Sequence, residues 1–178
     1  DASPIISVAI RTALEFGVWH SMQAAPPSTV QGAFVHGFAT EREMLSAFRT
    51  FLAGRTNEET LLVGHNILHF DLPRLRQAFL RNGLQLPAVL SADGQPAFDT
   101  MREFCRRFSA DSDSGMIGLD ELLKKIGLPS HKDIASGADV PGLFAAGQFE
   151  TILRYTLLDV ATEADVFLRL TGCSPSLA

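Results

Sequence analysis

The sequence predicts an α/β domain in which helices flank a mixed β-sheet. Three observations lead to this prediction. The stretch from Leu61 to Gly64 is a short apolar run followed by a polar turn and a helix start, as expected of a buried parallel strand. Near the N-terminus, Ile5 to Thr12 and Phe16 to His20 have the composition of two paired antiparallel strands. Several other segments have helical patterns of apolar residues.

In the first half of the chain, the predicted hairpin is followed by a loop over residues 23–33, which is rich in Pro, Ala, Gly and Ser. Thr40-x-x-Glu43 then has the sequence of a capping box. It precedes an amphipathic helix from Glu41 to Leu52, whose apolar residues fall on one face.

The second half is predicted to be mainly helical, with glycines at helix ends. The predicted helices run from Leu72 to Asn82, from Leu119 to Ile126, briefly from Leu143, and from Gln148 to Leu170. Phe98-Asp99-Thr100 is predicted to lead into a further helix that continues through Phe108. Gly83, Gly127, Gly147 and Gly172 mark ends or breaks. The segments between them, residues 84–97, 109–118 and 130–139, are predicted to be irregular, and residues 109–118 to be exposed.

Length and composition predict one domain over residues 1–178 with a substantial core. The net charge of −5 argues against a protein that holds nucleic acid mainly through a basic surface, but it does not argue against a protein whose metal site is itself acidic. No apolar run approaches the roughly 20 residues that span a bilayer, and no signal peptide is visible, so no membrane partner is expected. Cys105 and Cys173 fit no ligand spacing, which favours a reducing, cytoplasmic setting.

Asp71 follows the predicted strand and its turn, at the edge of the sheet where α/β proteins bind ligands. Two roles fit an aspartate there. It can cap the helix that starts with Leu72-Pro73, stabilising it by about 1 kcal/mol. It can also bind a metal ion, and one carboxylate can do both.

Tyr155 and Asp159 lie one turn apart on the long C-terminal helix and therefore project from the same face. Asp159 stands in an apolar segment, where an unpaired charge would be costly. It is either a buried acid paired with Arg154 or Tyr155, or a ligand of a hard cation such as Mg²⁺ or Mn²⁺. Tyr155 is the single tyrosine beside 13 phenylalanines, which favours a use for its hydroxyl over simple packing.

The patterns Asn66-x-x-x-Phe70-Asp71 and Tyr155-x-x-x-Asp159 resemble the second and third motifs of the tyrosine branch of the DEDD 3'-5' exonucleases. The chain is most similar to the proofreading exonuclease domain of family B DNA polymerases and its stand-alone relatives. The histidine branch fits less well, because its histidine position is Arg154 here. The resemblance implies an RNase H-like fold with a mixed central sheet flanked by helices.

In that family, four carboxylates hold two divalent metal ions about 4 Å apart, and the tyrosine orients the attacking water. The resemblance implies Asp71 and Asp159 as ligands of Mg²⁺ or Mn²⁺ and Tyr155 as a catalytic residue. It also implies Asn66, Phe70 and His65 as contacts of the 3'-terminal nucleotide, although Asn66 and Phe70 also fit a turn and the core. Zinc on His65 and His69 is disfavoured because the segment is predicted to be a strand and turn.

The first motif of the family, an Asp-x-Glu on the first strand, is not visible in this sequence. Its strand can lie upstream of Asp1, can be disordered, or can be lost in a relative that kept the fold without the catalysis. The first two explanations are favoured, because loss of catalysis would free Asp71, Tyr155 and Asp159 to change.

The expected function is therefore 3'-5' hydrolysis of DNA from a single-stranded 3' end, with release of nucleoside monophosphates, in DNA repair or proofreading. A polymerase or another protein is a possible partner. One alternative is an inactive exonuclease-like module that binds nucleic acid or a protein. A second is an RNA exonuclease with the same chemistry.

Overall fold

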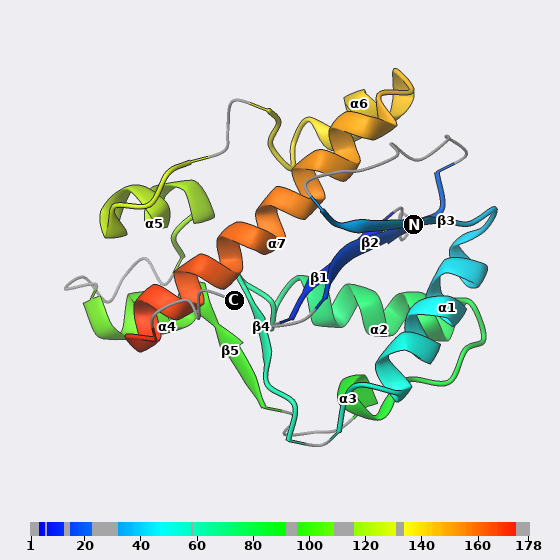
Figure 1. The fold of residues 1–178 in the computed structure, drawn as a ribbon, viewed down its shortest axis with the longest axis horizontal. Coiled ribbons are helices and arrows are strands. Elements are labelled where there is room, and N and C mark those ends of the chain that lie inside the picture. Colours follow the sequence, from blue (N-terminus) through cyan, green and yellow to red (C-terminus); the bar gives the residue numbers. More distant parts are fainter. Residues whose placement is uncertain are drawn as a thin grey trace.

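The computed structural model describes residues 4–5, 7–12, 15–22, 32–57, 59–91, 96–108, 116–130 and 134–173. It contains both helices and strands, which confirms the predicted α/β class (Figure 1). In chain order the elements are β1 (Ser7–Arg11), β2 (Phe16–His20), β3 (Phe34–Gly37), α1 (Glu41–Ala53), β4 (Leu62–Gly64), α2 (Asp71–Arg81), α3 (Ala88–Ser91), β5 (Ala97–Asp99), α4 (Thr100–Phe108), α5 (Leu119–Ile126), α6 (Val140–Ala145) and α7 (Phe149–Thr171).

The strands form two small sheets. In the first, of order β1-β2-β3, β1 and β2 pair antiparallel and β2 and β3 pair parallel. In the second, β4 and β5 pair parallel. The predicted hairpin and the mixed strand directions are confirmed. The single central sheet is not, because within the described residues β4 pairs on one side only and is an edge strand toward β1.

The first sheet is packed on both faces, as its alternating side chains require. Val8 and Ile10 of β1 contact the core beneath α1, α2 and α3, whereas Ala9 contacts the core beneath α7. In β2, Trp19 belongs to the core beneath α1, α2 and α3, and Val18 belongs to the core beneath α7. Figure 1 shows α7 running across the strands, with α1, α2 and α3 grouped apart from it. The result is a three-layer arrangement with α7 as one layer.

A third core lies where α4 and α5 pack against the second half of α7. Its centre is formed by Met101, Phe104, Leu122 and Val166, together with Ile117. Ile117 is 7% exposed, so the prediction that residues 109–118 are exposed is wrong at this position. Residues 109–115 lie outside the described part of the chain.

Strong local signals gave accurate helix bounds. The Thr40–Glu43 capping box is present, and Gly83, Gly127 and Gly172 have the left-handed φ values that glycine favours at helix ends. Three short elements were missed: β3, α3 and β5. Residues 84–97 are therefore not wholly irregular. Phe98 and Asp99 end β5 and lead directly into α4, which begins at Thr100 and ends at Phe108, so the helix predicted there is confirmed. None of the helices in the described part is long and apolar enough to cross a membrane.

Candidate active site

The turn after β4 brings Asp71 to the first position of α2. Asn66 has a φ of 59°, the left-handed conformation that asparagine tolerates better than most residues. Its carbonyl accepts hydrogen bonds from the amides of His69 and Phe70, at 3.2 and 2.9 Å. The N-cap position of α2 belongs to Phe70 and has no side-chain cap. Asp71 is therefore not the cap of this helix, and its carboxylate faces the site.

Buried Asp99, at the end of β5, holds this turn in place. It is 2% exposed, and its carboxylate accepts hydrogen bonds from the amides of Asn66 (3.1 Å) and Leu68 (3.3 Å). It also accepts one from the amide of Arg102 in the first turn of α4 (3.2 Å). Because β4 and β5 are neighbours, one carboxylate links the turn, the second sheet and α4.

Helix α7 supplies three further polar side chains, Tyr155, Asp159 and Glu163, at intervals of one turn. The Tyr155 hydroxyl donates a hydrogen bond to the Asp159 carboxylate. A Cβ atom placed on Gly137 would lie 3.7 Å from that hydroxyl, so the 134–139 segment passes close to it. Burial, together with the bond to Asp159, holds the pKa of the Tyr155 phenol well above its usual range. Tyr155 is therefore a neutral hydrogen-bond donor and not a base.

These residues meet at a cavity of about 490 Å³ between α5, α7 and the turn after β4, which we call the site cavity. It is lined by Asp71, Tyr155, Asp159 and Glu163, with Phe70 and His65 beside them. A second, larger cavity of about 820 Å³ lies between β1 and β4, and we call it the β1–β4 groove. Phe70, Asp71, Asp159 and Glu163 line both, so the acids stand where the two cavities meet.

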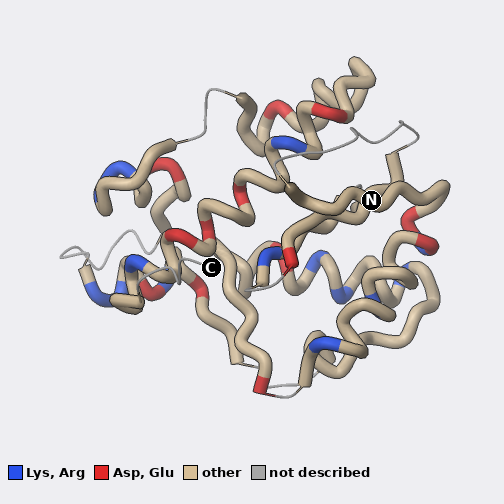
Figure 2. Tube along the Cα trace, viewed as in Figure 1, with Lys and Arg blue, Asp and Glu red and all other residues tan. Residues whose placement is uncertain are grey.

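The electrostatics of the site are dominated by its acids. Asp71 keeps solvent-exposed surface, but protein surrounds its carboxylate on most sides, and this desolvation raises its pKa to about 6. Arg74 opposes the rise, whereas the negative charges of Asp99 and Asp159 add to it. Burial, with Asp71 and Asp159 nearby, raises the pKa of Glu163 to about 8, although the His65 amide donates to it. Figure 2 shows acidic positions recurring along α7 and basic positions along α2.

The three residues predicted to contact substrate lie in different settings. Phe70 is 47% exposed at the rim of both cavities, with the Arg74 guanidinium 4.1 Å from its ring centroid. His65 lines the site cavity, but its Nε2–H donates to the Ile117 carbonyl (2.8 Å) and its Nδ1 lies 3.1 Å from the Thr100 hydroxyl. Asn66 lines neither cavity, and its observed role is to form the turn.

Sequence reasoning missed Glu163 and Asp99 as members of this site. The spacing of Glu163, four residues after Asp159, could have identified it, because that spacing continues the stripe begun by Tyr155. Asp99 gave a weaker signal, since an aspartate at the start of a helix is common for reasons of capping alone.

A model of the family described as predicted 3'-5' exonucleases related to the exonuclease domain of PolB matches residues 37–178, well over half of the chain. The chain belongs to this family. The match includes the turn after β4 and the stripe on α7, while β1 and β2 precede it. No curated protein matches the chain.

The oxygen ligands that Asp71 and Asp159 offer, where the two cavities meet, are chemically suited to a divalent cation. The carboxylates of Asp71 and Asp159 are the hard oxygen ligands that Mg²⁺ and Mn²⁺ bind. Burial is the main cause of the raised pKa of Asp71, and repulsion by Asp159 adds to it; a bound cation would relieve that repulsion. In the described part of the chain, no three His, Cys, Asp or Glu side chains are grouped so as to hold a metal ion. The pair would need further ligands.

Proposed function

We propose that this protein is a metal-dependent 3'-5' exonuclease that hydrolyses the terminal phosphodiester of a single-stranded DNA 3' end and releases nucleoside monophosphates. The proposal includes an RNase H-like domain over residues 1–178 that is completed by a first strand not visible in this sequence. The observation that carries it is the convergence of Asp71, Asp159 and the Tyr155 hydroxyl on one cavity in a chain of this family.

The proposed chemistry divides the work among these residues. Asp71 and Asp159, together with further ligands, would hold two Mg²⁺ or Mn²⁺ ions, which would supply Lewis-acid stabilisation of the attacking and leaving oxygens. Tyr155 stays protonated and positions a hydrogen-bond donor beside Asp159, where it would orient the attacking water. Phe70 offers an exposed ring on which a terminal base could stack.

The experiment is a digestion assay on the full-length protein with a single-stranded DNA oligonucleotide labelled at its 5' end. The expected result is a ladder shortened from the 3' end with Mn²⁺ or Mg²⁺, and none in chelator. Asp159→Asn should abolish it. Asp165→Asn, the same change at an exposed position of α7, is the matched control and should leave it intact. Undigested DNA with fully folded wild-type protein and metal would overturn the proposal.

A second candidate is an inactive exonuclease-like module that binds nucleic acid or a protein partner. It is favoured by one observation, namely that the described residues group no three metal ligands. The same assay separates the two candidates, because a module would retain the oligonucleotide in a binding measurement without shortening it. An RNA oligonucleotide of the same sequence, run in parallel, decides between DNA and RNA as the preferred substrate.

A further inference from the structure

The charged residues that line the two cavities differ in kind. Within the described part of the chain, those that line the site cavity are, apart from His65, all acidic: Asp71, Asp120, Glu121, Asp159 and Glu163. The β1–β4 groove is lined by some of the same acids but also by four arginines: Arg11, Arg55, Arg74 and Arg81. A nucleic-acid strand carries a negative charge on every phosphate, and these acids repel it. A cation beside the acids would therefore favour its binding.

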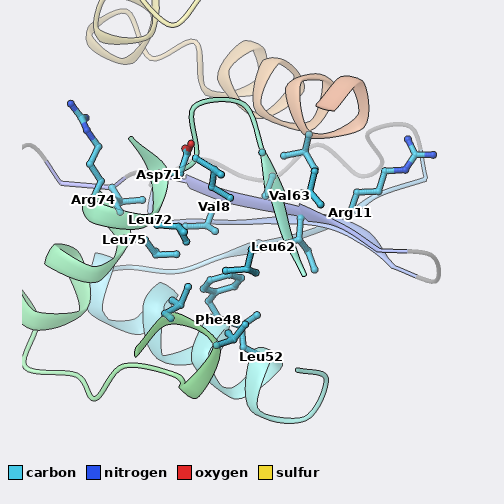
Figure 3. A pocket seen from close by; sticks show the side chains of 18 of the residues that line it. Val8, Arg11, Phe48, Leu52, Leu62, Val63, Asp71, Leu72, Arg74 and Leu75 are labelled. Carbon is cyan, nitrogen blue, oxygen red and sulfur yellow. The ribbon is translucent and has the colours of Figure 1, made fainter. Parts of the chain in front are cut away.

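Two of these four arginines are already engaged. Arg55 and Arg81 each form an ion pair with a glutamate, at closest distances of 2.6 and 2.7 Å. Arg11 and Arg74 form no ion pair within the described residues. Figure 3 shows Arg11 at the other end of the groove from Asp71. Arg74 lies three residues after Asp71 on α2, so it is the arginine of the groove that can meet a phosphate close to the acids.

Phe70 holds the Arg74 side chain at the rim of both cavities. The guanidinium carbon of Arg74 lies 4.1 Å from the centre of the Phe70 ring, and the Arg74 amide donates to the Phe70 carbonyl at 3.3 Å. Figure 3 shows the side chain extending away from the apolar residues Phe48 and Leu52. A guanidinium that rests on a ring keeps the N–H groups in its plane available, and their forked arrangement matches two oxygens of a phosphate. The stacking thus reduces the freedom that Arg74 would lose on binding a phosphate.

The stability of the fold does not account for an arginine at this position. Arg74 is exposed and belongs to none of the three hydrophobic cores of the described residues. It lies at the end of the first turn of α2, near the helix N-terminus, where the helix dipole disfavours a positive charge. Neither core packing nor helix formation therefore explains the residue, whereas binding of an anion does.

We propose that Arg74 is a phosphate-binding residue for single-stranded nucleic acid and that it binds the second phosphodiester linkage from the 3' end. This inference rests on the proposed function, in which the first linkage is cleaved and its phosphate lies at Asp71 and Asp159. Arg74 lines the groove but not the site cavity. A terminal nucleotide in the site cavity would therefore leave the rest of the strand to pass Phe70 and Arg74. The contact favours substrates of three or more nucleotides, because a dinucleotide has no second linkage.

The first test measures digestion of two single-stranded DNA oligonucleotides by the full-length protein. In one of them, a methyl group replaces one oxygen of the second linkage from the 3' end and so removes its charge. For the first cut, this change should lower kcat/KM of the wild type by about tenfold, as should Arg74→Gln with the unmodified strand. The two changes together should cost no more than either alone, because each removes the same contact. Arg49→Gln, the same change at an exposed arginine of α1 that lines neither cavity, should match the wild type.

The second test measures binding and does not need digestion. Fluorescence anisotropy of the labelled oligonucleotide in chelator, at several salt concentrations, gives the slope of log affinity against log salt concentration. Arg74→Gln should make this slope shallower by about 0.7, the contribution of one phosphate contact on a single strand. Arg74→Lys keeps the charge and should retain the slope. A role of Arg74 in packing alone would leave the slope the same in all three proteins.

Each result has a defined consequence. A loss with Arg74→Gln to which the uncharged linkage adds its full effect overturns the proposal, because Arg74 and that linkage then act separately. Equal losses with Arg74→Gln and Arg49→Gln also overturn it, because any surface charge would then serve. A shallower salt slope with Arg74→Gln, in a protein that digests no DNA, upholds the phosphate contact and refutes the exonuclease. Digestion that neither change affects supports the exonuclease and overturns the contact.

Discussion

The Tyr155 hydroxyl donates a hydrogen bond to the carboxylate of Asp159, one turn further along α7. This bond ties the proposed water-orienting group to a proposed metal ligand. The phenol keeps its proton, since burial and Asp159 both raise its pKa. Its contribution to the reaction is therefore that of a positioned hydrogen-bond donor. Loss of the hydroxyl should lower the activity and leave the stability of the fold almost unchanged.

Tyr155→Phe should lower the rate of digestion by about 10- to 1000-fold, the range for loss of one positioned polar group. The free energy of unfolding should change by no more than about 1 kcal/mol, because the ring still packs and one hydrogen bond is lost. Initial rates under saturating metal and urea denaturation check the two parts. An unchanged rate would show that the hydroxyl serves only as a hydrogen-bond partner of Asp159 and takes no part in the reaction.

Asp159→Asn should show whether Asp159 is a metal ligand or an acid that only stabilises the fold. In chelator, the melting temperature should stay level or rise, because one of several repelling carboxylates is removed. Mn²⁺ should stabilise the wild type appreciably and the variant little. Thermal melts of both proteins, with Asp165→Asn as control, provide the measurement. A pronounced drop for Asp159→Asn in chelator would instead identify a structural acid whose buried partner has lost its counter-charge.

Helix α1, the β1–β2 hairpin and α7 could be predicted because their signals are local: a capping box, paired apolar runs and a terminal glycine. β5 could not, because three residues become a strand only by pairing with β4, far away in the sequence. Asp71 and Asp159 were visible through their spacing from Asn66, Phe70 and Tyr155. The anchoring by Asp99 was not, since it depends on which turn lies beside β5 in the fold.

Glu163 should make the stability of the metal-free protein depend on pH. Its pKa is raised from 4.5 to about 8, so the folded state binds its proton more tightly than the unfolded chain does. This stabilising contribution is fully present below about pH 4.5 and is lost as the pH rises through about 8. The glutamine of Glu163→Gln does not titrate. The free energy of unfolding of this variant, minus that of the wild type, should therefore increase as the pH rises from about 4.5 to about 8.

Urea denaturation in chelator, at several pH values across that interval, measures this difference for Glu163→Gln. Glu150→Gln, the same change at an exposed position of α7, is the control and should show no comparable trend. A difference between Glu163→Gln and wild type that stays constant with pH would mean that Glu163 is solvated like a surface acid.

Asn66→Gly should distinguish a turn residue from a substrate contact. Glycine accepts the φ of 59° without strain, so the fold should be retained with little change in melting temperature. If Asn66 only forms the turn, KM and kcat for digestion should also be retained. A rise in KM of more than about tenfold, equivalent to about 1.4 kcal/mol of lost binding, would assign its side chain to the substrate.

Asp99→Asn should loosen the turn that presents Asp71. The carboxylate accepts from the amides of Asn66, Leu68 and Arg102 with both oxygens, and an asparagine side chain offers one acceptor oxygen in its place. At least one buried amide would then lack a partner, at a cost of about 1–3 kcal/mol. Exchange of the Asn66 and Leu68 amides should accelerate more than that of Ala78 in α2, which reports on global unfolding. Digestion should slow even at temperatures where the variant is folded, because Asp71 is held less firmly. Equal acceleration at all three amides would mean that Asp99 stabilises the whole domain and has no particular hold on the turn.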